Sequence, residues 1–113
     1  MKRAILTLAL LATGNVVAQP IYCSGKISSV YIQSDGNVNI NGTWRNSWTS
    51  ICNTKGSDPI TCSLWASYAA SAVQNNLKVT VSYNLPAGSS CASLETYGNA
   101  PKPTYFMIHN PSM

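Results

Sequence analysis

The clearest alternation of hydrophobic and polar positions lies late in the chain, in the stretch LKVTVSYN at residues 77–84. Apolar side chains occupy every second position there, and polar ones fill the gaps. A period of two places one set of side chains on each face of a strand. The stretch therefore predicts a β-strand with one buried and one exposed face.

The period changes in the preceding segment. Apolar residues recur there at steps of three and four, which marks one face of a helix. They are Trp65, Tyr68, Ala69, Ala72 and Val73. We expect Thr61 or Ser63 to cap the start of this helix and the pair 75–76, two asparagines, to end it.

Strand-like sequence dominates the first half. The segments KISSVYIQS (26–34) and NVNING (37–42) flank an Asp-Gly turn signal and predict a hairpin. A two-residue loop would pair aliphatic residues with polar ones, whereas a three-residue loop ending at Asn37 places Ile40 opposite Ile32. We favour the longer loop, with Asn37 in the left-handed conformation.

The remaining segments complete an order of three strands, one helix and two strands. A third strand is expected in the second half of 43–53, and a fifth in TYFMIH (104–109), after a long Pro-, Gly- and Ser-rich connection over 85–104. The predicted fold is mainly β with one helix (α+β). This order is that of a small five-stranded OB-like barrel, although an open sheet packed on one helix would give the same string.

The amino terminus predicts export. Lys2 and Arg3 precede a short apolar run, and small residues lead to Ala18. This is the pattern of a secretory signal peptide over residues 1–18, cleaved before Gln19. The apolar run is too short to span a bilayer. We expect residues 19–113 to form one small domain, secreted or periplasmic in a bacterium, without a membrane span.

Charge argues against a nucleic-acid partner. Residues 19–113 carry five Lys and Arg against three Asp and Glu, a net charge of +2. The five cations are scattered rather than clustered on one segment, unlike those of nucleic-acid binders.

Four cysteines, all after the predicted cleavage site, indicate disulfides. An even number of cysteines in a short exported chain is typical of a disulfide framework. None of the spacings gives the close pairs that zinc sites use, so we expect no metal and no cofactor. Of three connectivities, we favour Cys52 with Cys62, closing a loop that contains Gly, Asp and Pro, and Cys23 with Cys91, tying the amino terminus to the late connection.

The titratable residues do not indicate an enzyme. Acid–base catalysis normally requires two placed groups, and each available group has a simpler role. Asp35 belongs to a turn, Asp58 to a loop before a proline, Glu95 to a solvated segment and His109 to the surface near the carboxyl terminus. The chain also has no GxSxG sequence.

Aromatic residues favour a binding function. Trp44 and Trp48 flank Arg45 in the turn before the third strand, and we take these three residues as candidate ligand contacts. Packing of both tryptophans against one end of the barrel is the alternative. The expected partner is a glycan or a protein, and the chain is compatible with a homo-oligomer.

Residues 52–84 resemble the centre of a known toxin family. A strand cysteine, a loop, Cys62, Trp65 on an alanine-rich helix and then KVTVSYN are similar to the B subunits of secreted bacterial AB5 toxins of the subtilase-cytotoxin and typhoid-toxin type. That resemblance implies an OB-fold and a disulfide before the helix. The subunits of that family assemble into pentamer rings and bind sialylated glycans. It identifies no sugar-contacting residue here. The same layout is also similar to that of small exported proteins of gammaproteobacteria.

Overall fold

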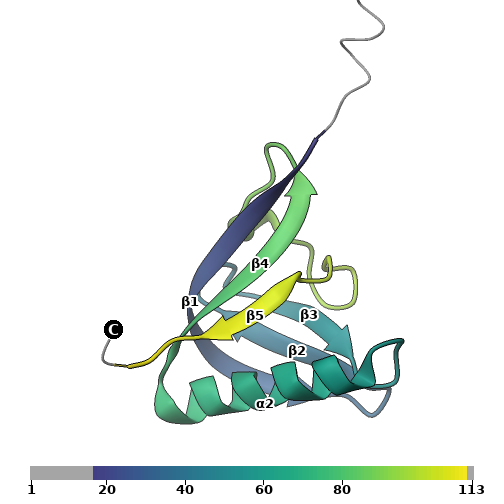
Figure 1. Ribbon diagram of the computed structural model, residues 1–113, viewed down its shortest axis with the longest axis vertical. Helices are drawn as coiled ribbons and strands as arrows, with labels where there is room; N and C mark the ends of the chain where they lie inside the picture. Colours follow the sequence, from purple (N-terminus) through teal and green to yellow (C-terminus); the bar gives the residue numbers. More distant parts are fainter. Residues whose placement is uncertain (1–16, 112–113) are drawn as a thin grey trace, which may run out of the picture.

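The computed structural model describes residues 17–111, which form one antiparallel five-stranded sheet and one α-helix. The predicted order of three strands, a helix and two strands is confirmed (Figure 1). The elements are β1 (Ala18–Ile32), β2 (Asn37–Gly42), β3 (Trp48–Asn53), α2 (Pro59–Asn75), β4 (Lys78–Pro86), the 3₁₀ turn η1 (Cys91–Ser93) and β5 (Tyr105–Ile108). The predicted export segment lies almost wholly outside the described residues.

The sheet is open, so the closed barrel that we expected is not formed. Its order is β3-β2-β1-β4-β5, which leaves β3 and β5 at opposite edges. Near the β3 edge a single parallel bridge joins Thr49 to Tyr97 in the connection before β5. Pro101 and Pro103 lie between this bridge and β5, and proline has no N–H to continue a ladder. The last strand is therefore only four residues long.

β1 holds the two halves of the sheet together. Its first half, Ala18–Lys26, pairs with β4, and its second half, Ile27–Ile32, pairs with β2. A register shift between Ile27 and Ser29 marks the change of partner. The paired β1–β4 ribbon rises beyond the other strands, while α2 lies across the opposite end of the curved sheet (Figure 1).

The hairpin between β1 and β2 has a three-residue loop, but not the one predicted. Gln33 and Asn37 close the loop, and Gly36 takes the left-handed backbone with φ +98°. Ile40 lies opposite Val30, and Val38 opposite Ile32, two positions from the expected register. Glycine adopts positive φ more easily than asparagine does, which explains the shift. An even shift leaves each side chain on its predicted face.

Helix α2 begins earlier than predicted. Asp58 is the N-cap, and its Oδ1 accepts a hydrogen bond from the Thr61 amide at 3.3 Å. Pro59 follows at the first helical position, where a missing N–H costs nothing. The predicted end is confirmed, since Asn76 caps the helix with φ 53°.

The buried face of α2 consists of small residues. Cys62, Ala66, Ala69 and Ala72 are buried, while Trp65 and Val73 are half-buried against the core. Tyr68, which we placed on this face, is exposed. Tyr68 lies one turn after the exposed Leu64 and shares its side of the helix.

β4 is buried on both faces, contrary to the half-exposed strand predicted. Val79, Val81 and Tyr83 lie in the core, but Thr80 and Ser82 on the other face are buried too. The neighbouring strands β1 and β5 explain this burial. Ser82 pairs with Tyr22 and Tyr105, and the Thr80 hydroxyl contacts Ser24 Oγ and His109 Nε2, both at 2.8 Å.

Both predicted disulfides are confirmed. Cys52 at the end of β3 joins Cys62 in the first turn of α2, and Cys23 in β1 joins Cys91 in η1. Such bonds persist in oxidising, extracellular-type compartments. In the part of the chain that the structure describes, no helix is both long and apolar enough to cross a membrane.

Candidate functional site

Trp44 and Arg45 lie in the turn between β2 and β3, and Trp48 begins β3. Their three side chains make different contacts. The Trp44 ring covers Gly42 so closely that a Cβ on that glycine would lie 2.5 Å from ring atom Cζ2. The ring is half-buried and packs against the core, and its Nε1 is buried. Trp44 therefore has a packing role, which was the alternative interpretation of the sequence.

Arg45 connects this turn to the late connection. Its Nε donates a hydrogen bond to the Leu94 carbonyl at 2.7 Å, which joins residues 49 positions apart. Trp48 lies at the start of β3 and contacts Tyr31 edge to face, with ring centroids 4.8 Å apart and planes at 84°. The three predicted contacts thus do not converge on one ligand site.

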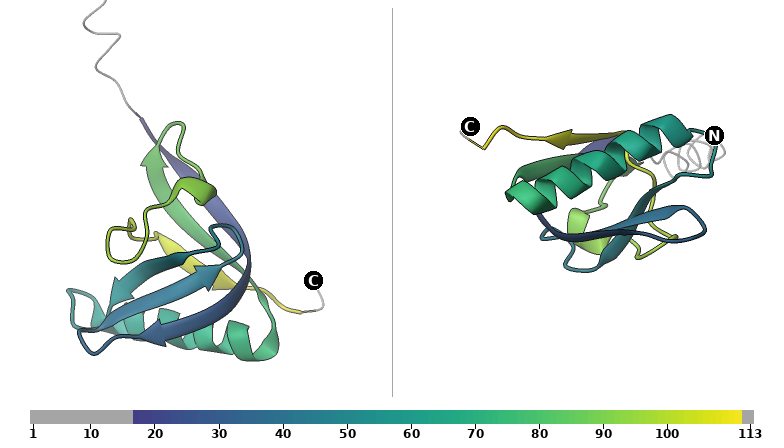
Figure 2. Two further views of the ribbon diagram at one scale, coloured as in Figure 1. Left: turned by 180° about the vertical axis from the view of Figure 1, so that it is seen from behind. Right: turned by 90° about the horizontal axis from the view of Figure 1, so that it is seen from below.

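The segment 87–104 lies beside β3 and the β1–β4 ribbon (Figure 2). The Cys23–Cys91 disulfide and the Arg45 hydrogen bond fix its first half. Tyr97 pairs with β3, donating to the Trp48 carbonyl at 2.7 Å and accepting from the Ser50 amide at 3.0 Å. Tyr97 has φ 53°, a conformation that costs a bulky residue energy and that the bridge maintains. A disulfide, a side-chain hydrogen bond and a backbone bridge therefore hold the segment 87–104 against the sheet.

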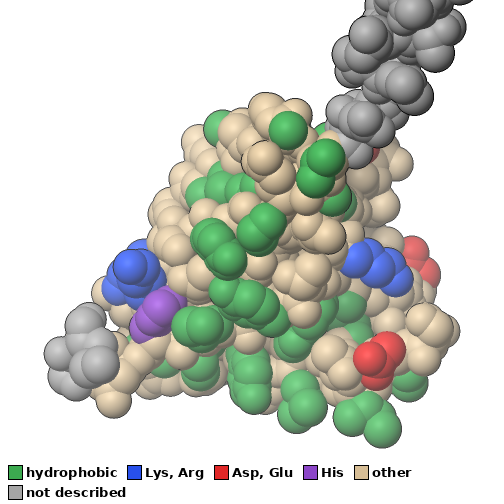
Figure 3. All heavy atoms as spheres, turned by 45° about the horizontal axis from the view of Figure 1, so that its top comes forward, with side chains coloured by type: hydrophobic (Ala, Val, Ile, Leu, Met, Phe, Trp, Pro, Cys, Tyr) green, Lys and Arg blue, Asp and Glu red, His purple; other side chains and the backbone are tan. Residues whose placement is uncertain are grey.

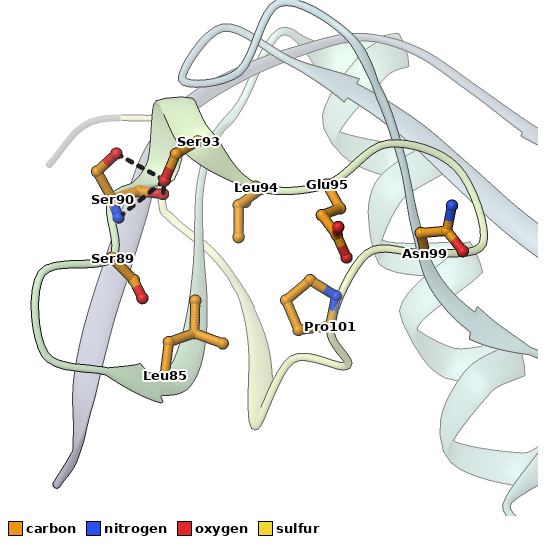
Figure 4. A pocket seen from close by; sticks show the side chains of 8 residues that line it. All are labelled: Leu85, Ser89, Ser90, Ser93, Leu94, Glu95, Asn99 and Pro101. Atoms are coloured by element: carbon orange, nitrogen blue, oxygen red, sulfur yellow. Dashed lines mark hydrogen bonds between the residues drawn. The ribbon is translucent and has the colours of Figure 1, made fainter. Parts of the chain in front are cut away.

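A concavity of about 250 Å³ lies between the end of β4, η1 and the loop that follows η1 (Figure 4). Three apolar side chains form its inner surface, and five polar ones surround them. They are Leu85, Leu94 and Pro101, with Ser89, Ser90, Ser93, Glu95 and Asn99. The serines gather on one side, whereas Glu95 and Asn99 lie on the other.

Hydrogen bonds hold one side of this concavity in place. The Ser93 hydroxyl is 3.0 Å from both Ser90 Oγ and the Ser90 carbonyl, and the Ser90 amide donates to it at 3.2 Å. Among the residues described, the side chains of Ser89, Glu95 and Asn99 have no hydrogen-bond partner. The hydrogen bonds therefore fix the Ser90–Ser93 side, while Ser89, Glu95 and Asn99 keep polar groups that a ligand could contact.

A second concavity, of about 170 Å³, lies at the open edge of the sheet beside the Cys52–Cys62 disulfide. Ile51, Trp65 and Pro103 contribute apolar surface, and Asp58 and Lys102 contribute charge. Asp58 already caps α2. This concavity is smaller than the first and its one carboxylate is engaged in the helix cap, so we take the first as the candidate site.

The chain does not match any protein-family model, curated protein or solved structure with which it was compared. The resemblance to toxin B subunits therefore stays a prediction from the residues. Over residues 17–111, no three His, Cys, Asp or Glu side chains come together as metal ligands would.

Sequence reasoning assigned the concavity residues to a surface connection and missed their convergence. The signal was present in part, since Cys91 and two prolines restrict the segment, and serines flank the cysteine on both sides. Glu95 and Asn99 could not be placed from the sequence, because their positions depend on the Tyr97 bridge to β3.

Proposed function

We propose that this protein is an exported carbohydrate-binding module and that the concavity beside η1 holds the glycan. The observation that carries the proposal is the unpaired set of Ser89, Glu95 and Asn99 around an apolar inner surface. A sugar ring presents hydroxyl groups at its edge and C–H groups on its faces. Amide, carboxylate and hydroxyl groups pair with the former, and Leu85 and Leu94 pack against the latter.

The size of the concavity limits what it holds. Its volume of about 250 Å³ is below the roughly 300–1,000 Å³ typical of pockets for drug-sized ligands. It therefore suits one terminal sugar or a short end of a glycan. Since Leu94 lines the concavity and Arg45 binds its carbonyl, Arg45 contributes by positioning the wall rather than by touching the ligand.

The predicted export signal and the two disulfides support a location outside the cytoplasm, where cell-surface glycans are accessible. The resemblance to glycan-binding B subunits is consistent with this class of ligand. Within this proposal the concavity binds its ligand and does not transform it.

A glycan array followed by titration of the selected glycan tests the proposal. Asn99→Ala should weaken binding by about tenfold, since one or two hydrogen bonds are lost. Gln74→Ala, on the exposed side of α2, is the matched amide control and should bind as the original chain does. An array without any bound glycan, or equal loss in both variants, would refute the proposal.

The second candidate is a protein-binding module without a glycan ligand, and a stripe on α2 favours it. Ile60, Leu64 and Tyr68, spaced four residues apart, are 75%, 51% and 40% exposed. Hydrophobic side chains line the edge of the molecule over this helix (Figure 3). The 17 residues of α2 include no charged side chain.

A second copy of the chain fits this stripe. An antiparallel pair of helices centred on Leu64 would bring Ile60 of each copy to Tyr68 of the other, as an isologous contact requires. No like charges would meet. Sedimentation velocity should show self-association that Leu64→Lys reduces and Gln74→Lys leaves unchanged. Monomers at every concentration would exclude this candidate.

A further inference from the structure

The charge of the concavity points to a class of sugar. Glu95 is the one charged residue among its eight lining residues. Within residues 17–111, its carboxylate forms no ion pair or hydrogen bond. A ligand bound there meets a single charged lining group, the Glu95 carboxylate, beside apolar side chains.

None of the cations of the described chain lines the concavity, although Arg45 is bound to the backbone of one lining residue. Arg45 Nε binds the Leu94 carbonyl and its side chain does not line the concavity. Lys102 follows Pro101 directly, yet Pro101 lines this concavity and Lys102 lines the other one. The remaining lysines lie on other elements: Lys26 Nζ binds the Asn76 carbonyl at the end of α2, Lys55 Nζ binds the Ser34 carbonyl, and Lys78 lies opposite Lys26.

The overall positive charge therefore does not extend to the site. With a net charge of +2 over residues 19–113, long-range attraction would favour acidic glycans, but that attraction is screened beyond about 10 Å at moderate salt. Within contact distance the nearest charge is the Glu95 carboxylate. Charge-assisted hydrogen bonds are roughly twice as strong as neutral ones, so local charge decides selectivity.

We infer that the concavity prefers an amino sugar, whose ammonium group pairs with Glu95, over a neutral sugar, and rejects an acidic one. This inference rests on the proposed glycan-binding function. Ser89 and Asn99 would pair with hydroxyl groups common to all three classes. Glu95 alone distinguishes between them.

Titration calorimetry with three oligosaccharides of equal length tests the inference: one of glucosamine, one of glucose and one of galacturonic acid. The glucosamine oligomer should bind about tenfold more tightly than the glucose oligomer, and the galacturonic acid oligomer should bind most weakly. Glu95→Gln, which keeps the shape of the side chain, should abolish the advantage of glucosamine and leave glucose binding unchanged.

Asp35→Asn is the matched control for net charge. It removes one carboxylate from the hairpin loop, at a residue that does not line the concavity, and keeps the oxygen that accepts from the Asn37 amide. Preference for glucosamine should survive this change. Equal binding of the glucosamine and glucose oligomers, or a preference that Glu95→Gln does not alter, overturns the inference while glycan binding stands. No binding of any of the three oligomers contradicts the inference, and the glycan array then decides whether the proposed function stands.

Discussion

At the scale of single residues, the structure separates packing from ligand contact. The sequence placed Trp44 and Trp48 correctly around one turn. It did not show that the two side chains lie in different environments. The environment depends on Gly42, because only the lack of a side chain there lets the Trp44 ring lie flat against the strand. No local sequence pattern reports such a contact between a ring and a backbone.

Replacement of each tryptophan should therefore have a different cost. Trp44→Ala removes a half-buried ring from the core and should lower the free energy of unfolding by about 3 kcal/mol. Trp48→Ala loses mainly an edge-to-face contact with Tyr31 and should cost about 1 kcal/mol. Urea denaturation measures both. Equal costs would contradict the packing role of Trp44.

Tyr83 gives a pH-dependent prediction. Burial raises the pKa of its hydroxyl from 10.0 to about 12, because the charged form is poorly solvated in the core. Below pH 10 both the folded and the unfolded chain keep this proton, so Tyr83 adds no pH dependence. Between pH 10 and 12 the unfolded chain loses the proton first, and the free energy of unfolding falls by about 3 kcal/mol.

Tyr83→Phe isolates this effect from the other tyrosines. The hydroxyl has no hydrogen-bond partner among the described residues, so its removal should leave stability at pH 7 unchanged or slightly higher. Denaturation midpoints measured from pH 8 to pH 12 should then decline less steeply than those of the original chain. Parallel curves for the two proteins would contradict the account.

At the scale of elements, the sequence pattern predicted the type and order of the five strands and the helix, but it missed η1 and the first half of β1. The helical stripe was visible from Trp65 onward, yet the first turn has no apolar repeat and contains Pro59. The helix begins where Asp58 caps it and Pro59 takes the first position, and both residues were expected in a loop. The hairpin shows the same limit, since Gly36 rather than Asn37 takes the positive φ.

A comparison of caps tests the start of α2. Asp58→Ala should reduce the free energy of unfolding by about 1 kcal/mol, because the Thr61 amide loses its acceptor. Asp58→Asn keeps an acceptor and should restore most of this stability. Ser63→Ala, at the predicted cap, should change it by less than about 0.5 kcal/mol. A larger effect at Ser63 than at Asp58 would favour the later start.

At the scale of the whole molecule, the Cys23–Cys91 disulfide and the Tyr97 bridge hold the segment 87–104 against the open sheet, and this segment lines the concavity. The order of the elements along the chain was predictable, but closure of the sheet into a barrel was not. Closure depends on whether residues near 97 or residues near 105 pair with β3. In the structure Tyr97 pairs with β3, and residues before and after Tyr97 line the concavity. The site is therefore a product of tertiary pairing, which explains why the sequence indicated a loop.

The two disulfides should differ in their effect on ligand binding. Replacement of Cys23 and Cys91 by serine frees η1 and should abolish glycan binding, besides removing roughly 4 kcal/mol of stability. Replacement of Cys52 and Cys62 should cost roughly 3 kcal/mol and leave binding intact, because that bond lies at the other concavity. Binding is compared at a temperature where circular dichroism shows both variants folded. Equal retention of binding would contradict the role of η1.

The most direct test of the central claim is a nuclear magnetic resonance titration of residues 19–113 with a glucosamine oligomer. The account predicts that amide shifts change in the segment 85–101, around Ser89, Glu95 and Asn99, and stay constant along α2 and at the Tyr31–Trp48 contact. Saturable changes centred on α2 or on Trp48 would show that the glycan binds elsewhere, and no change at any concentration would show that the concavity beside η1 does not bind glucosamine.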